Sequence, residues 1–162
     1  MRMFLMASMV LTSMTLCSGC GSIDQKADAD EIQIARTWLN HLKSEKTDLE
    51  EALSVMSSEV NFDGKIVSEE DQIRKKLAEY RQALTNTAWT VRITDFERLD
   101  DKRIEQLMRN SKHTRSYALS RDKIRCMVLF RLRVVLKSTG EENTDGVFLG
   151  FDADKKIVSW FD

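Results

Sequence analysis

Residues 124–137 read Ile-Arg-Cys-Met-Val-Leu-Phe-Arg-Leu-Arg-Val-Val-Leu-Lys, and this stretch decides the fold class. Its odd positions mix apolar residues with arginines and a lysine. Side chains alternate between the two faces of a strand, so the spacing predicts a long β-strand with one buried and one mixed face. The face predicted to be buried carries Ile124, Cys126, Val128, Phe130, Leu132, Val134 and Leu136.

Similar alternation predicts further strands on both sides of this one. Residues 89–94 alternate Trp, Val and Ile with Thr and Arg. Residues 147–151 are apolar at every second position, and residues 157–161 close the chain. The polar residues 138–143 and 152–155 predict the turns between these strands.

A polar segment, residues 100–113, interrupts the strands. Ile104, Leu107 and Met108 recur in it at helical spacing, so we predict a helical insert. The apolar part of the mixed strand face suits either a cover by this insert or a contact with a second copy of the chain.

The N-terminal half carries helical periodicity instead. Apolar residues recur on one helix face within 34–42, with Asp28 and Asp30 as candidate N-caps. Residues 47–50, Thr-Asp-Leu-Glu, have the form of a capping box and predict a second helix. A third begins at residues 68–71 and has the apolar stripe Ile73, Leu77, Tyr80 and Leu84.

A short strand with a turn at Asp63-Gly64 is predicted between the second and third helices, within residues 59–67. Three helices followed by a run of antiparallel strands predict one α+β domain, with the helices packed on one face of the sheet. The 42% hydrophobic and 31% charged residues fit a globular domain, and the net charge of −1 excludes a globally basic nucleic-acid binder.

This order of elements resembles the nuclear transport factor 2-like superfamily, which includes ketosteroid isomerases and polyketide cyclases. The matching features are the two-helix start, the strand around Val60–Asp63, and the third helix ending Tyr80-Arg-Gln-Ala-Leu84. The closing hairpin, Gly150-Phe-Asp-Ala-Asp-Lys-Lys-Ile-Val-Ser-Trp160, also resembles the family's last strand pair. The resemblance implies a cystatin-like cone roll over residues 30–162, in which a curved sheet wraps a helix around an open pocket, often in a homodimer. That fold hosts both enzymes and non-catalytic binders.

The N-terminus contains Cys17-Ser-Gly-Cys20 directly behind Arg2 and an apolar run at residues 4–16. A C-x-x-C pair for redox or metal chemistry needs a βαβ context or a second ligand pair, and the chain has only one other cysteine, Cys126. The apolar run is too short to span a bilayer but suits a signal peptide, which could also be cleaved without lipidation.

The small residues before Cys20 resemble the lipobox of bacterial lipoproteins, although Cys17 stands where that family usually has leucine. The resemblance implies a signal peptide at residues 1–19, a diacylglycerol on Cys20 and a tether over residues 20–29. It places the protein in the bacterial cell envelope, anchored to the membrane by lipid. Gly21 follows in place of a retention aspartate, which favours the periplasmic face of the outer membrane if the organism is Gram-negative.

The family resemblance also supplies catalytic candidates. It implies that Asp63 could be a general base facing an apolar cone, with Tyr80 or His41 as the oxyanion donor. Where the family's first helix can carry a tyrosine, this chain has Trp38 and His41, which weakens the enzyme interpretation. Asp63-Gly64 is equally an ordinary turn dipeptide.

The segment 102–137 contains eleven Lys or Arg against two acids, and it predicts a basic face with Arg125, Arg131 and Arg133. This face could bind anionic lipid headgroups or an acidic partner, or simply be a solvated sheet face. The two histidines, His41 and His113, have no partner at metal-ligand spacing, so we expect no metal, and no motif predicts a cofactor.

These patterns predict an envelope lipoprotein whose domain binds a small apolar ligand or an envelope protein, without catalysis. Two alternatives remain open. One is a cofactor-independent isomerase or cyclase with Asp63 as base; the other is a structural accessory subunit of an envelope complex.

Overall fold

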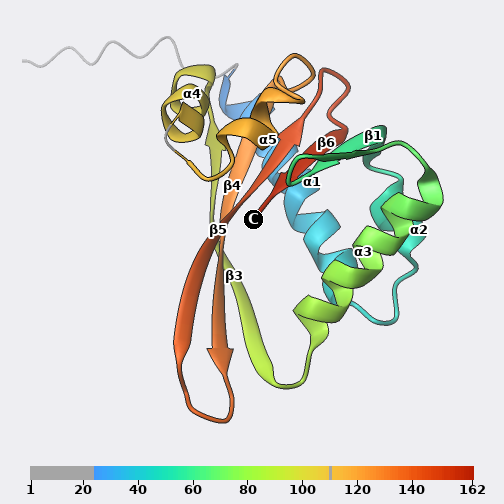
Figure 1. Ribbon diagram of the computed structural model, residues 1–162, viewed down its shortest axis with the longest axis vertical. Helices are drawn as coiled ribbons and strands as arrows, with labels where there is room; N and C mark the ends of the chain where they lie inside the picture. Colours follow the sequence, from blue (N-terminus) through green and yellow to red (C-terminus); the bar gives the residue numbers. More distant parts are fainter. Residues whose placement is uncertain (1–23, 110) are drawn as a thin grey trace, which may run out of the picture.

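The computed structural model describes residues 24–109 and 111–162, and it has helices on both faces of one sheet (Figure 1). The elements are α1 (Asp24–Lys43), α2 (Leu49–Leu53), β1 (Met56–Phe62), β2 (Lys65–Val67), α3 (Glu70–Thr85), β3 (Trp89–Leu99), α4 (Asp101–Arg109), α5 (Thr114–Ala118), β4 (Cys126–Leu136), β5 (Glu142–Phe151) and β6 (Ile157–Phe161).

The six strands form a curved, unclosed sheet in the order β2-β1-β6-β5-β4-β3. Neighbouring strands are antiparallel except β1 and β6, which run parallel and bring residues about a hundred positions apart into register, such as Phe62 and Trp160. The predicted α+β class, with helices packed on a curved sheet, is therefore confirmed, and the sheet is mixed rather than purely antiparallel.

The first hydrophobic cluster lies between the sheet and the helices α1 to α3. The even row of β4 contributes Cys126, Val128 and Phe130 to it, and α1 contributes Trp38. Burial of these apolar surfaces is the main term that holds the three helices on the sheet.

A second cluster lies on the opposite face of the sheet, under the helical insert. Ile104 and Met108 of α4 pack over Met127 and Leu129, the apolar members of the odd row of β4. The insert therefore covers this part of the mixed face, which is one of the two predicted covers.

Several predicted boundaries differ in the structure. Helix α1 begins at Asp24, so the expected caps Asp28 and Asp30 lie within it, as do residues 24–29 of the expected tether. The N-cap of α2 is Asp48 instead of Thr47, because the Asp48 carboxylate accepts the Glu50 N–H at 3.3 Å. Cys20 and the rest of the lipobox lie outside the described residues.

Three strands extend beyond the helices at one end of the molecule (Figure 1). We call this extension the overhang and define it as residues 89–94 of β3, 131–136 of β4 and 142–146 of β5. Helix α4 lies at the other end, where α1 begins. Two ion pairs, Arg98–Glu31 and Lys155–Asp30, tie the end of β3 and the β5–β6 turn to the first part of α1.

Candidate functional site

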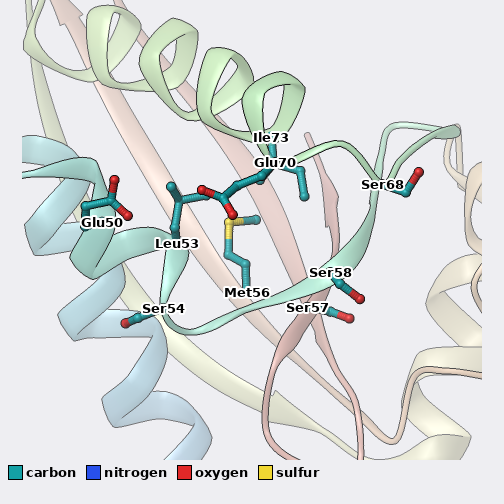
Figure 2. A pocket seen from close by; sticks show the side chains of 9 residues that line it. All are labelled: Glu50, Leu53, Ser54, Met56, Ser57, Ser58, Ser68, Glu70 and Ile73. Atoms are coloured by element: carbon teal, nitrogen blue, oxygen red, sulfur yellow. The ribbon is translucent and has the colours of Figure 1, made fainter.

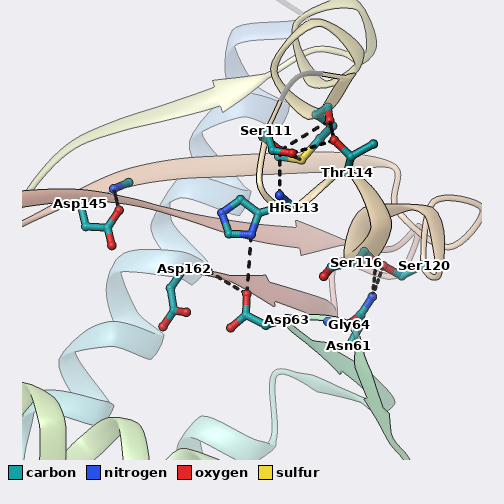
Figure 3. Close-up of polar contacts among 12 residues, drawn as sticks. Asn61, Asp63, Gly64, Ser111, His113, Thr114, Ser116, Ser120, Asp145 and Asp162 are labelled. Atoms are coloured by element: carbon teal, nitrogen blue, oxygen red, sulfur yellow. Dashed lines mark hydrogen bonds and ion pairs between the residues drawn. The ribbon is translucent and has the colours of Figure 1, made fainter.

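Asp63 lies in the tight turn between β1 and β2, at an edge of the molecule where β6 also ends (Figure 3). Both turn residues have positive φ, +48° at Asp63 and +93° at Gly64, which matches the aspartate-glycine preference of such hairpins. The Asp63 N–H donates to the Trp160 carbonyl at 3.0 Å. This hydrogen bond holds the side chain of Asp63 beside the chain end at Asp162.

The Asp63 carboxylate is a partly desolvated acid. Its pKa is raised to about 6, first by burial and then by the Asp162 side chain, while the Asp162 N–H and Lys112 oppose the shift. The Asp162 N–H donates to Asp63 Oδ1 at 3.1 Å. The Asp63 side chain is nevertheless 39% exposed, so it lies at the surface and not inside an apolar cone.

His113 of the α4–α5 connection faces this carboxylate from the second cluster. Its Nδ1 lies 3.7 Å from Asp63 Oδ1, which is too long for a hydrogen bond. The ring is only 6% exposed and packs against Phe148 and Phe161. Burial, followed by Lys112, lowers the His113 pKa, against the opposing carboxylates of Asp162 and Asp145.

Tyr80 comes near the same end of the sheet from helix α3, and His41 does not. The Tyr80 ring stacks on Trp160 with centroids 4.3 Å apart, and burial, with the Asp162 and Asp63 charges, raises the pKa of the phenol above its usual value. His41 Nδ1 instead lies 2.7 Å from Glu51 of α2. The structure therefore places Asp63 and Tyr80 within electrostatic range and directs His41 elsewhere.

The interior expected to form an open pocket is occupied by aromatic rings. Trp160 contacts Trp38 at 5.2 Å and Phe130 at 6.1 Å between ring centroids, and Phe130 stacks on Phe96 at 5.7 Å. The indole N–H groups of Trp38 and Trp160 are buried, and among the described residues nothing accepts their hydrogen bonds. Buried donors of this kind are normally satisfied, so these two indoles are exceptions in a packed aromatic interior.

A cleft of about 460 Å³ lies outside this interior, between α2, the start of β1 and the start of α3 (Figure 2). Leu53, Met56 and Ile73 provide its apolar side, and Glu50 and Glu70 provide carboxylates. Arg74 pairs with both glutamates. The two carboxylates therefore share one guanidinium group as their counter-charge.

The predicted basic residues do not form one surface. Arg125 lies just before β4, and Arg131 and Arg133 lie in the overhang on the same face. Arg125 and Arg131 are six positions apart, which is about 20 Å of strand, and α4 covers the row between them. Cross-strand register instead puts Arg92 opposite Arg133, a neighbour that sequence reasoning did not single out.

Sequence reasoning also missed Asn61, which fastens the insert to the β1–β2 hairpin (Figure 3). Its Nδ2 donates to the Ser116 carbonyl at 2.6 Å and to Ser120 Oγ at 3.0 Å, and its Oδ1 accepts the Gly64 N–H at 2.7 Å. A buried asparagine on a strand is visible in the sequence, but its partners are more than fifty positions away.

The described residues contain no group of three or more histidine, cysteine or acidic side chains placed to hold a metal ion. Burial raises the pKa of the Cys126 thiol to about 11, so this thiol is a poor nucleophile. Within the described part of the chain, no helix is long and apolar enough to cross a membrane.

No protein-family model matches this sequence, and no curated protein sequence is significantly similar to it. Among solved structures, the fold is similar to an NTF2-like protein of unknown function from Exiguobacterium sp. 255-15. The two share 13% sequence identity, the alignment covers 78% of this chain and 93% of the other, and the TM-score is 0.43. At this identity the likeness concerns the arrangement of helices and strands and extends to no activity.

Proposed function

We propose that this chain is an envelope lipoprotein, anchored through a lipid on Cys20, that binds a protein partner without catalysis. The binding surface is the overhang, which points away from the end where α1 begins (Figure 1). Asp24 follows Cys20 by four residues, so an anchor there would hold the start of α1 within about 14 Å of the lipid. The overhang would then face a partner away from the membrane.

The observation that carries the proposal is an apolar row with no core beneath it. Register pairs Trp89 with Leu136 and Val91 with Val134 on the helix-facing side of the sheet. All four side chains are partly exposed and belong to neither hydrophobic cluster. The ends of α3 and α1 reach this row through two hydrogen bonds, from the Trp89 indole N–H to the Ala83 carbonyl and from Lys43 Nζ to the Val91 carbonyl, while the four apolar side chains stay partly exposed. A partly exposed apolar sheet face of this kind is typical of an interaction surface.

The size of this row suggests a short apolar segment of a protein as its occupant. Two cross-strand pairs are too few for a stable homodimer, which buries roughly 1,200–2,000 Å² in total. A small apolar ligand in the cone is less well supported, because aromatic rings pack in the interior. Acid–base catalysis is less well supported as well, because Asp63 lies at the surface.

A photocrosslinking side chain at Leu136 tests the proposal in cells that make the full chain. We expect one discrete adduct, abolished by Val134→Asp and retained in Val135→Asp. These adjacent valines point to opposite faces, so they make a matched pair. Loss of the adduct in both variants or in neither would contradict the overhang as the interface, and an adduct of twice the chain's mass would identify a second copy as the occupant.

Mass spectrometry of membrane-extracted protein tests the anchor separately. We expect a diacylated N-terminal peptide beginning at Cys20, and release of the domain from the membrane by Cys20→Ser. Turnover of a carbonyl substrate that Asp63→Ala abolishes would overturn the non-catalytic interpretation. Binding of an apolar carbonyl compound that quenches the fluorescence of Trp38 and Trp160 would overturn the choice of a protein partner over a small ligand.

A further inference from the structure

The outer surface of the α4–α5 insert has a composition that its packing role does not explain. The inward side chains Ile104 and Met108 cover the sheet. On the outer side, Lys102 and Arg109 of α4 and Arg115 of α5 are exposed. From residue 100 to 125 the sequence has eight Lys or Arg against four acids, so this segment is net basic in a chain of net charge −1.

Apolar groups accompany these charges. Leu119, just after α5, is 54% exposed, one of the few large apolar side chains so exposed in the described chain. Next to it a groove of about 350 Å³ lies between α4 and α5, with Met108, Tyr117 and Ala118 among its lining residues. Arg109, Arg121 and Glu105 also line this groove, and Arg121 pairs with Glu105 at 2.6 Å, so Arg109 is the basic side chain there that this pair leaves available. Basic side chains around exposed apolar groups are the combination found in proteins that lie on an anionic membrane surface.

The position of the insert agrees with this composition. Helix α4 lies at the end of the molecule where α1 begins (Figure 1), and Glu31 of α1 pairs with Arg98 just before α4. A lipid on Cys20 would hold this end close to the bilayer, where the potential of anionic lipids acts within a screening length of about 8 Å. The basic overhang residues Arg131 and Arg133 lie toward the other end and would not reach that potential.

We propose that the outer surface of α4 and α5, with Lys102, Arg109, Arg115 and Leu119, docks on the anionic lipid headgroups of the membrane that holds the anchor. The inference rests on the proposed lipid anchor. It adds a defined orientation, with the insert against the bilayer and the overhang away from it.

An environment-sensitive dye at Leu119→Cys tests this docking in the lipidated chain, because lipid caps Cys20 and Cys126 is buried. In vesicles of phosphatidylcholine and phosphatidylglycerol we expect a blue shift that high salt reverses. The shift should be absent in phosphatidylcholine alone and at a control label, Ile66→Cys, which is 45% exposed on β2. The triple variant Lys102→Glu, Arg109→Glu, Arg115→Glu should abolish the shift, and the control Lys46→Glu, Lys75→Glu, Lys137→Glu should keep it.

A second arm separates this proposal from the anchor. The unlipidated chain with Cys17→Ser and Cys20→Ser, labelled at Leu119→Cys and mixed with the same vesicles, should still respond, with an affinity that falls roughly fivefold for each basic charge removed. A response to soluble glycerophosphoglycerol equal to that with vesicles would mean a free-anion site and overturn membrane docking. An equal response in both lipid compositions, or none in either, would overturn it too, whereas missing lipid on Cys20 would overturn only the anchor.

Discussion

At the scale of single residues, the Asp63 carboxylate destabilises the fold above pH 6. Its folded pKa of about 6 lies above the ordinary value of 3.8, so between these pH values the folded chain binds a proton that the unfolded chain has released. Stability from this group is therefore present at low pH and is lost as the pH rises through 6. The stability contribution of the buried, neutral His113 depends on pH in the opposite direction. Its pKa is lowered in the folded chain, so below about pH 6.5 the unfolded chain binds a proton more readily and the folded state loses stability.

Asp63→Asn should therefore stabilise the protein at pH 8 by about 1 kcal/mol, after discounting for a carboxylate more than a third exposed. The difference should shrink toward zero at pH 4, and the His113 contribution cancels between the two proteins. Asparagine keeps the acceptor for the Asp162 N–H and tolerates the positive φ. Urea unfolding at both pH values measures the difference in the free energy of unfolding, and Asp122→Asn, at an exposed position, is the control. A larger gain at pH 4 than at pH 8 would contradict the effect of burial, Asp162 and Lys112 on the Asp63 pKa.

At the scale of elements, the sequence predicts the helices and strands whose apolar residues recur at a regular spacing. The apolar stripe of α3 and the alternating apolar residues of β3 and β4 identify those elements. A helix or strand that buries one face needs apolar residues at the spacing of that face. The start of α1 is missed because its first residues carry no apolar periodicity. Helix α5 is missed because five residues with no buried side chain give no stripe.

The candidate site was only partly predictable from the sequence, because its turn is local but the neighbours of that turn are distant along the chain. Asp63-Gly64 is a turn signal that can be read locally, and the turn is where the sequence predicts it. Its neighbours His113 and Asp162 come from a loop 50 positions and a strand end 99 positions along the chain. Only the parallel pairing of β1 with β6 and the folding of the insert over the sheet bring them together.

Asn61 fastens the later part of the insert, at Ser116 and Ser120, to the β1–β2 hairpin, and this gives a prediction. Asn61→Ala removes two donated hydrogen bonds and leaves the Gly64 N–H and the Ser116 carbonyl without their partner. We expect a loss of about 1–3 kcal/mol and faster amide hydrogen exchange in residues 111–125, while β4 and β5 keep their protection. Asn143→Ala, at an exposed position of β5, is the control. Equal acceleration in the insert and in the sheet would mean that Asn61 supports the whole fold instead of the insert.

At the scale of the whole molecule, strand β6 joins the two hydrophobic clusters. Its neighbouring residues Trp160 and Phe161 point to opposite faces, the first into the cluster under α1 to α3 and the second into the cluster under α4. Both side chains are almost fully buried. Because one strand supplies a large side chain to each cluster, neither cluster can lose β6 and keep its packing, so the domain should unfold in a single transition.

Phe161→Ala should therefore cost about 3–5 kcal/mol and lower the stability of both faces together, although Phe161 belongs to only one cluster. In chains that also carry Trp89→Phe, tryptophan fluorescence reports the first face through Trp38 and Trp160, and a dye at Leu119→Cys reports the insert. The two urea midpoints should coincide in the parent chain and move together in Phe161→Ala, with a smaller common shift in Phe161→Leu, which leaves a smaller cavity. If the dye midpoint alone fell, the insert would be a separate unit, and its dissociation from the sheet could then accompany the membrane docking proposed for its outer surface.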